Sequence, residues 1–152
     1  MSYQLWFREG VEDFERARKL IELNDVKAAY FFLQQAVEKI FKALLLKKAE
    51  FVRTHDISLL YEYVSRAYNV FGSLTSEEVD VLRSLTIHYS AARYPDARVR
   101  LRVSEELYSD VNRALRVVEV VAKVIELSEI ALKDDPRFGF DVRGFNVDEV
   151  VS

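Results

Sequence analysis

The amino-acid sequence predicts an all-α fold: an up-and-down four-helix bundle with a long C-terminal helix and a short peripheral tail. Its 152 residues make about one domain, and half of them are apolar while 31% are charged, as in globular proteins. Only 4 glycines and 2 prolines occur, which favours long elements over a many-stranded sandwich or barrel with frequent turns. Apolar residues recur at spacings of three and four in several segments, the pattern of amphipathic helices.

The first two predicted helices follow each other closely. One face of the first collects Val11, Phe14, Ala17, Leu20 and Ile21. Asn24 and Asp25 then offer oxygens that can cap a second helix running from Val26 through Leu46. The second helix is apolar on most sides, so we expect it to be central and buried. Its narrow polar stripe comprises Lys27, Gln34, Gln35, Glu38, Lys39 and Lys42. The favoured interpretation is an i, i+4 ion pair between Glu38 and Lys42, and the alternative is a polar channel at a partner surface.

The third and fourth predicted helices each begin at a capping sequence. Thr54-His55-Asp56 precedes the third, which carries Ile57, Leu60, Tyr61, Val64 and Tyr68 and ends at Gly72. Thr75-Ser76-Glu77-Glu78 forms a capping box that opens the fourth. We expect the fourth helix to run to about Ser90, because Pro95 forbids its continuation.

The last predicted helix has two apolar rows. One row steps regularly through Leu107, Val111, Ala114, Val118, Val121 and Ile125, and the second comprises Val117, Val120, Val124, Leu127 and Ala131. Burying four or five such side chains is worth on the order of 5–10 kcal/mol, so both rows need a cover. A homodimer is the favoured cover for the second row, with Phe138, Phe140 and Phe145 of the tail as the rival.

One segment breaks the helical pattern. From Arg98 to Val103, basic and apolar residues strictly alternate. A period of two predicts an extended stretch with its arginines on one side.

Composition narrows the function classes. The chain has no cysteine, and neither a glycine-rich phosphate loop nor zinc or di-iron spacing, so no metal and no cofactor are expected. It has neither a signal-peptide pattern nor an apolar run of about 18 residues, so a cytoplasmic location away from membranes is expected. Residues 134–152 hold five acids against two arginines, which accounts for the whole net charge of −3. We therefore divide the chain into a neutral helical bundle (1–133) and an acidic tail (134–152), and any nucleic-acid contact must come from a local basic patch.

Three passages, taken in order, resemble the HEPN family of small helical bundles. They are Gln34-Gln35-Ala36-Val37-Glu38-Lys39 with Lys42-Ala43-Leu44, then Thr54-His55-Asp56-Ile57 with Leu59-Leu60, and finally Ala92-Arg93-Tyr94-Pro95-Asp96. The resemblance implies that the protein binds nucleotides and forms a dimer. It also implies that the protein acts with a minimal nucleotidyltransferase partner, as in toxin–antitoxin pairs. Some HEPN members are metal-independent endoribonucleases that carry an arginine followed four to six residues later by a histidine.

Arg83 and His88 have this ribonuclease spacing. A histidine can move the proton of a ribose 2′-hydroxyl, and an arginine can hold the phosphate, so these are the candidate catalytic residues. On a straight helix the two would point about 140° apart, and a dimer would have to pair them across its interface. Ser84 and Ser90 stand where ribonuclease members tend to have a larger polar residue and a tyrosine. The alternative is a helix-end histidine and a surface arginine.

A second group of residues predicts a phosphate or nucleotide site. It comprises Arg93, Arg98, Arg100 and Arg102, with Tyr89 and Tyr94 as platforms that can stack a base. The alternative pairs these arginines with Asp96, Glu105 and Glu106 as solvated ion pairs. For His55, a nucleotide contact or second acid–base role stands against a plain capping turn in which Thr54 or Asp56 caps the helix.

The sequence thus predicts a nucleotide- or RNA-binding HEPN protein that acts with a nucleotidyltransferase, with metal-independent endoribonuclease activity as a further expectation. The alternative is a non-catalytic, dimeric protein-interaction module.

Overall fold

A computed structural model describes residues 2–133 and confirms the all-α fold, with no strand in that range. The helices are α1 (Tyr3–Glu22), α2 (Val26–Lys47), α3 (Ile57–Ala67), α4 (Ser76–Arg83), α5 (His88–Ala91), α6 (Pro95–Arg100) and α7 (Val111–Leu132), with 3₁₀ turns η1 (Asn69–Ser73) and η2 (Leu107–Ser109). The predicted tail, with its three phenylalanines, lies outside the described residues. None of the described helices is long and apolar enough to cross a membrane.

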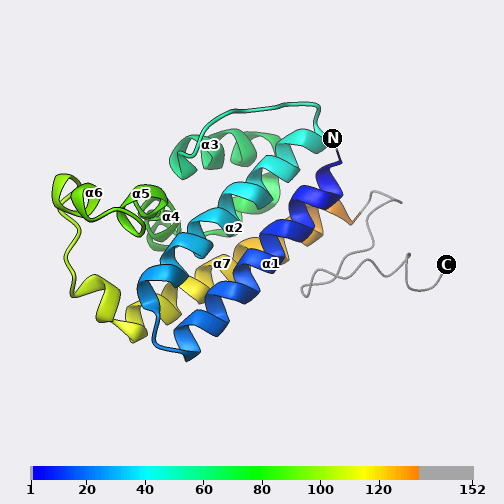
Figure 1. Ribbon diagram of the computed structural model, residues 1–152. Coiled ribbons are helices and arrows are strands. Elements are labelled where there is room, and N and C mark those ends of the chain that lie inside the picture. Colours follow the sequence, from blue (N-terminus) through cyan, green and yellow to red (C-terminus); the bar gives the residue numbers. More distant parts are fainter. Residues whose placement is uncertain (1, 134–152) are drawn as a thin grey trace.

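Helix α2 is the centre of the bundle, as its apolar circumference predicts. It contacts α1, α3, α5 and α7, and Figure 1 shows it running between α1 and α3. Its largest apolar side chains are almost completely buried, among them Leu33, Ile40, Phe41 and Leu44. Burial on most sides of one helix explains why so little of its surface is polar.

The predicted helix starts are confirmed. Asp25 accepts a hydrogen bond from the Ala28 amide (3.2 Å) at the start of α2. Asp56 caps α3 by accepting from the Ser58 amide (2.9 Å). Thr75 and Glu78 form the reciprocal capping box at α4. Each cap satisfies amides that a helix end would otherwise leave unpaired.

The second apolar row of α7 is buried inside a single chain. Val120 and Val124 have no exposed surface, and Val117 and Leu127 are buried as well. Contacts of α7 with α2, α4 and η1 accompany this burial, so the row requires neither a second subunit nor the tail as its cover. The first row is the less covered one, because Val118 is only partly buried and the nearby Leu115 is 45% exposed.

The prediction of an extended stretch between Arg98 and Val103 is wrong. Pro95 occupies the first turn of α6, where its fixed φ suits a helix and its missing amide hydrogen costs nothing. The apolar residues of the alternating pattern are not buried on one side, since Val99 is 80% exposed. Residues 98–100 are therefore the end of a short solvated helix, and residues 101–103 form the turn and coil that follow it.

The fourth helix is also shorter than predicted. Helix α4 ends at Arg83, four residues of turn follow, and α5 begins at His88. Arg83 and His88 therefore do not lie on one regular helix.

Gly10 lets α1 approach α2 closely, which gives a stability prediction. A Cβ atom at Gly10 would lie 2.7 Å from Cγ1 of Ile40 and 3.1 Å from the carbonyl oxygen of Ala36. Gly10→Ala gains about 1 kcal/mol of helix propensity but overpacks this contact by about 1–3 kcal/mol, so we expect a net loss in the free energy of unfolding. Urea unfolding of the variant measures this loss. Gly72→Ala is the control, because a Cβ there meets nothing within 4 Å and stability should stay within about 0.5 kcal/mol.

Candidate phosphate-binding site

A buried carboxylate on α2 organises the first part of the site. Glu38 is 5% exposed and accepts a hydrogen bond from Lys42 (2.9 Å) and another from Gln34 (2.9 Å). The ion pair with Lys42 confirms the favoured interpretation of this spacing. Burial alone would raise the pKa of Glu38, but hydrogen bonds from Lys42, Gln34 and His55 together outweigh it and lower the pKa. Glu38 is therefore held as a carboxylate below the surface of the protein.

His55 lies in the loop before α3 and contacts the Glu38 carboxylate. Its Nδ1 lies 2.9 Å from Oε1 of Glu38, and its carbonyl oxygen accepts a hydrogen bond from Gln34 (3.2 Å). The His55 side chain is nevertheless 51% exposed. With the carboxylate binding Nδ1, Nε2 is the nitrogen left to meet a ligand.

Tyr89 joins His55 to the segment that follows α4. The two rings are stacked, with centroids 3.8 Å apart and planes 16° apart. Thr86 holds the same two segments together, because its hydroxyl accepts a hydrogen bond from the Ile57 amide (3.0 Å). Asp56, beside His55, caps α3 as predicted, so the capping turn and the His55 contacts exist together.

Arg93 is the cation of the site. Its guanidinium carbon lies 4.5 Å from the centroid of the Tyr89 ring, 4.9 Å from that of Phe31 and 5.0 Å from that of Tyr94. Its Nε donates to the carbonyl oxygen of Tyr89 (2.7 Å). Arg93 is exposed and has no carboxylate partner among residues 2–133. We call the residues assembled here the Arg93 surface: Phe31, Gln34, Glu38, Lys42, His55, Tyr89, Arg93 and Tyr94.

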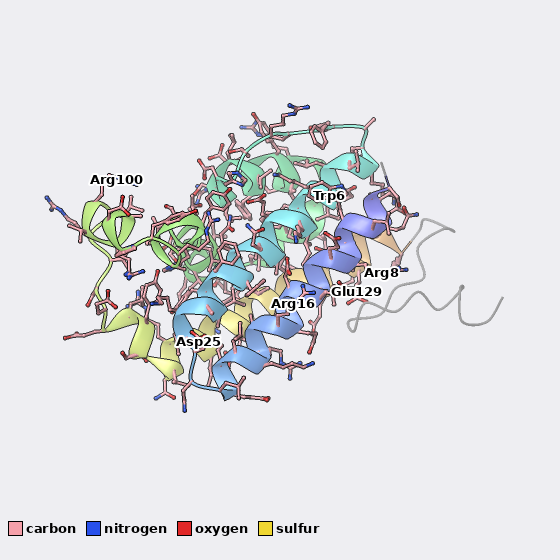
Figure 2. The ribbon with its side chains drawn as sticks, in the orientation of Figure 1. Trp6, Arg8, Arg16, Asp25, Arg100 and Glu129 are labelled. Carbon is pink, nitrogen blue, oxygen red and sulfur yellow. The ribbon has the colours of Figure 1, made fainter. Side chains whose placement is uncertain are left out.

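The other predicted phosphate-binding arginines do not join this surface. Arg98 donates to Glu105 (3.0 Å) and to the carbonyl oxygen of Ala91 (3.0 Å). The contact with Glu105 is one of the ion pairs that the alternative interpretation predicted. Arg100 and Arg102 are exposed, and Figure 2 places Arg100 on α6 at the outer edge of the molecule. Arg98 and Arg100 lie on α6, which spreads side chains around its axis instead of aligning them. Arg102 lies in the turn after α6, with a positive φ of 56°.

The candidate catalytic pair is not brought together within one chain. Arg83 lies 3.9 Å from Glu62 and 5.6 Å from the Tyr61 ring centroid, both on α3. His88 is 2% exposed, and its Nδ1 lies 2.8 Å from the hydroxyl oxygen of Tyr108. Burial, and secondly the charge of Arg113, lowers the pKa of His88 to about 4. A catalytic role for Arg83 and His88 stays a prediction.

The sequence reasoning did not find the contact between Glu38 and His55, which are 17 positions apart. A usable signal was present: a glutamate on an otherwise buried helix needs partners, and Lys42 alone cannot saturate both carboxylate oxygens. It also did not find the burial of His88 between Tyr30 and Tyr108, whose rings lie 4.4 and 5.5 Å from it.

The fold and this site define a helical-bundle protein with an exposed arginine that no described carboxylate pairs and an oriented histidine on one surface. Comparison with known proteins agrees with that class. The family model described as HEPN domain matches residues 3–131. The chain therefore belongs to the HEPN family.

Two relatives illustrate the match. A Methanocaldococcus jannaschii protein named "Putative toxin MJ1304" is 26% identical over 129 residues, which cover 81% of this chain and 85% of the relative. The crystal structure of TT1696 from Thermus thermophilus superimposes with a TM-score of 0.68, covering 86% of this chain and 98% of the other. Its sequence identity is 20%, so this likeness concerns the fold.

Proposed function

We propose that this HEPN protein is toxin-like and binds RNA through the Arg93 surface. The observation that carries the proposal is the Arg93 guanidinium, which is exposed, unpaired by any described carboxylate, and set among three aromatic rings beside His55. An arginine in this state attracts a phosphate, and the exposed ring of Tyr94 can stack with a base. Because the described bundle is close to neutral overall, a local site of this kind is what an RNA ligand would need.

Metal-independent RNA cleavage is the second candidate, and the pairing of Glu38 with His55 favours it. In that reaction the ribose 2′-oxygen attacks the adjacent phosphorus while Nε2 of His55 accepts the hydroxyl proton. The bond from phosphorus to the 5′-oxygen then breaks, and this oxygen takes a proton from water. The products end in a 2′,3′-cyclic phosphate and a 5′-hydroxyl. Arg93 would stabilise the charge on the phosphoryl oxygens, and Glu38 would keep the imidazole oriented.

The toxin-like character also suggests partners. The M. jannaschii relative carries the name of a putative toxin. As part of the proposal, a toxin-like protein would act with an antitoxin, for which a minimal nucleotidyltransferase is our candidate. A homodimer is part of the proposal as well. The second row of α7 is buried within the chain and gives no support for a dimer. The support is a groove of about 360 Å³ between α1 and α7, lined by Phe14, Val118, Ala122 and Ile125 among others.

One RNA experiment with two readouts tests the proposal. Labelled single-stranded RNA is mixed with purified protein in excess EDTA, and both binding and cleavage are measured. Arg93→Gln should weaken binding at least tenfold, because a hydrogen-bonded charge contact is worth about 1.5–3 kcal/mol. Arg66→Gln is the matched control: it removes another exposed arginine, at the end of α3 and outside both the Arg93 surface and the groove, and should leave binding unchanged. Equal losses in both variants would mean that only net charge matters.

The cleavage readout separates the two histidines. If His55 is the base, cyclic phosphate products disappear in His55→Gln and persist in His88→Gln. The reverse pattern would return the catalytic assignment to the predicted Arg83 and His88. Binding without cleavage in any protein would leave an RNA-binding protein that is not a nuclease.

A further inference from the structure

A second cavity lies away from the Arg93 surface, among α2, α4, α5 and α7. Its volume is about 330 Å³, enough for a small ligand. The apolar part of its lining comes from Val81, Ile87, Leu107 and Val117. Such walls suit a flat apolar ring better than a hydrated ion.

Tyr30 contributes a buried hydroxyl to this cavity that the fold does not use. The residue is 2% exposed and lines the cavity, and its hydroxyl oxygen has no hydrogen-bond partner among residues 2–133. Buried hydroxyls are almost always paired, so an orphan one indicates a role beyond packing. Burial raises the pKa of Tyr30, which keeps the hydroxyl protonated as a donor.

His88 lies next to this hydroxyl and is fixed in place. Its ring centroid is 4.4 Å from that of Tyr30, and the hydroxyl of Tyr108 binds its Nδ1. Nε2 of His88 has no partner among the described residues. The Tyr30 hydroxyl and Nε2 of His88 therefore line the cavity without a hydrogen-bond partner among the described residues.

One of the two cations in the cavity lining is unpaired. Arg116 is engaged with Glu77 (3.1 Å) and Glu119 (3.2 Å). The Arg113 side chain has no hydrogen bond or ion pair with any described residue, and its charge influences both Tyr30 and His88. An arginine in this position can bind an oxyanion in a bidentate manner. Asp80 also lines the cavity, and its carboxylate has no partner among the described residues. It can therefore accept a hydrogen bond from a donor group on the same ligand.

We propose that this cavity binds a small aromatic oxyanion: a planar ring that carries one phosphate or carboxylate. The ring packs between the apolar walls, and the oxyanion accepts hydrogen bonds from the Arg113 guanidinium and the Tyr30 hydroxyl. The binding site is distinct from the Arg93 surface, and the two share no residue.

The test is an NMR titration of the whole protein with phenyl phosphate and with benzoate, while benzyl alcohol and inorganic phosphate serve as controls. We expect at least one aromatic oxyanion to bind and to shift the imidazole resonances of His88, and the tighter of the two identifies phosphate or carboxylate as the preferred group. Both controls should bind at least tenfold more weakly. Benzyl alcohol binding as tightly would overturn the proposal, and so would the absence of any shift with both oxyanions at millimolar concentration.

Three variants make the assignment specific. Arg113→Gln should weaken binding at least tenfold, whereas Arg66→Gln, which removes an exposed arginine on α3 outside the cavity lining, should not change it. Tyr30→Phe should weaken binding several-fold yet keep or raise the midpoint of thermal unfolding, because the hydroxyl it removes has no partner in the fold. A fall in that midpoint would show that the hydroxyl serves the structure, and unchanged binding in Arg113→Gln would place the ligand elsewhere.

Discussion

Replacing Phe41 by alanine is expected to lower the free energy of unfolding by about 3–5 kcal/mol, the largest effect of a single substitution that we predict. Phe41 lies on α2 with no exposed surface. Its ring meets that of Phe71 edge-on at 6.0 Å between centroids, and that of Tyr61 at 6.4 Å. The cost is large because alanine leaves a cavity where α2, α3 and η1 meet, and a well-packed core closes such a space only in part.

Urea unfolding followed by circular dichroism measures the effect. The matched control is Phe51→Ala, since Phe51 is 51% exposed and its removal should cost no more than about 1 kcal/mol. Similar losses in the two variants would contradict the central position of α2 in the bundle.

The second large effect is a loss of stability in mild acid caused by His88. Its pKa falls from 6.5 to about 4 on folding, so between these values the unfolded chain binds a proton that the folded protein excludes. Stability must therefore decrease as the pH falls through this window. With these two pKa values, the loss between pH 7 and pH 5 is about 2 kcal/mol.

The measurement is the unfolding midpoint in urea between pH 7 and pH 5. His88→Gln should flatten this pH dependence. The lowered pKa of Glu38 acts in another window, because the stability that a depressed carboxylate contributes is lost only as the pH falls below its ordinary value of 4.5. A wild-type protein equally stable at pH 5 and pH 7 would contradict the burial of a neutral His88.

Much of the fold could be predicted from local patterns. The apolar circumference of α2 identified the central helix, and the caps at Asp25, Asp56 and Thr75 marked helix starts correctly. These features depend on residues within one turn of each other, so the sequence carries them directly. The same reasoning failed between Arg98 and Val103, where a local alternation competed with the helix start at Pro95 and the proline prevailed.

The candidate site divides in the same way. Arg93, Tyr89 and Tyr94 lie within six positions of each other, and the ring contacts of Arg93 show that the three residues meet. Phosphate binding by this group stays a prediction. Arg83 and His88 are equally close in the chain, but the turn between α4 and α5 separates them. Arg83 lies beside α3, and His88 is buried against Tyr108. Proximity in sequence therefore does not by itself bring two side chains together.

By itself, the sequence determined that this protein is an all-α bundle built on α2, that its candidate site residues lie between positions 83 and 102, and that it resembles the HEPN family. Only the tertiary structure decided which of those residues meet. Glu38 reaches His55 because α3 packs on α2, and Tyr30 reaches His88 because α5 packs on α2. The physical reason is that helix periodicity specifies which face of each helix is buried, whereas the choice of neighbour across that face depends on how all the faces are buried at once.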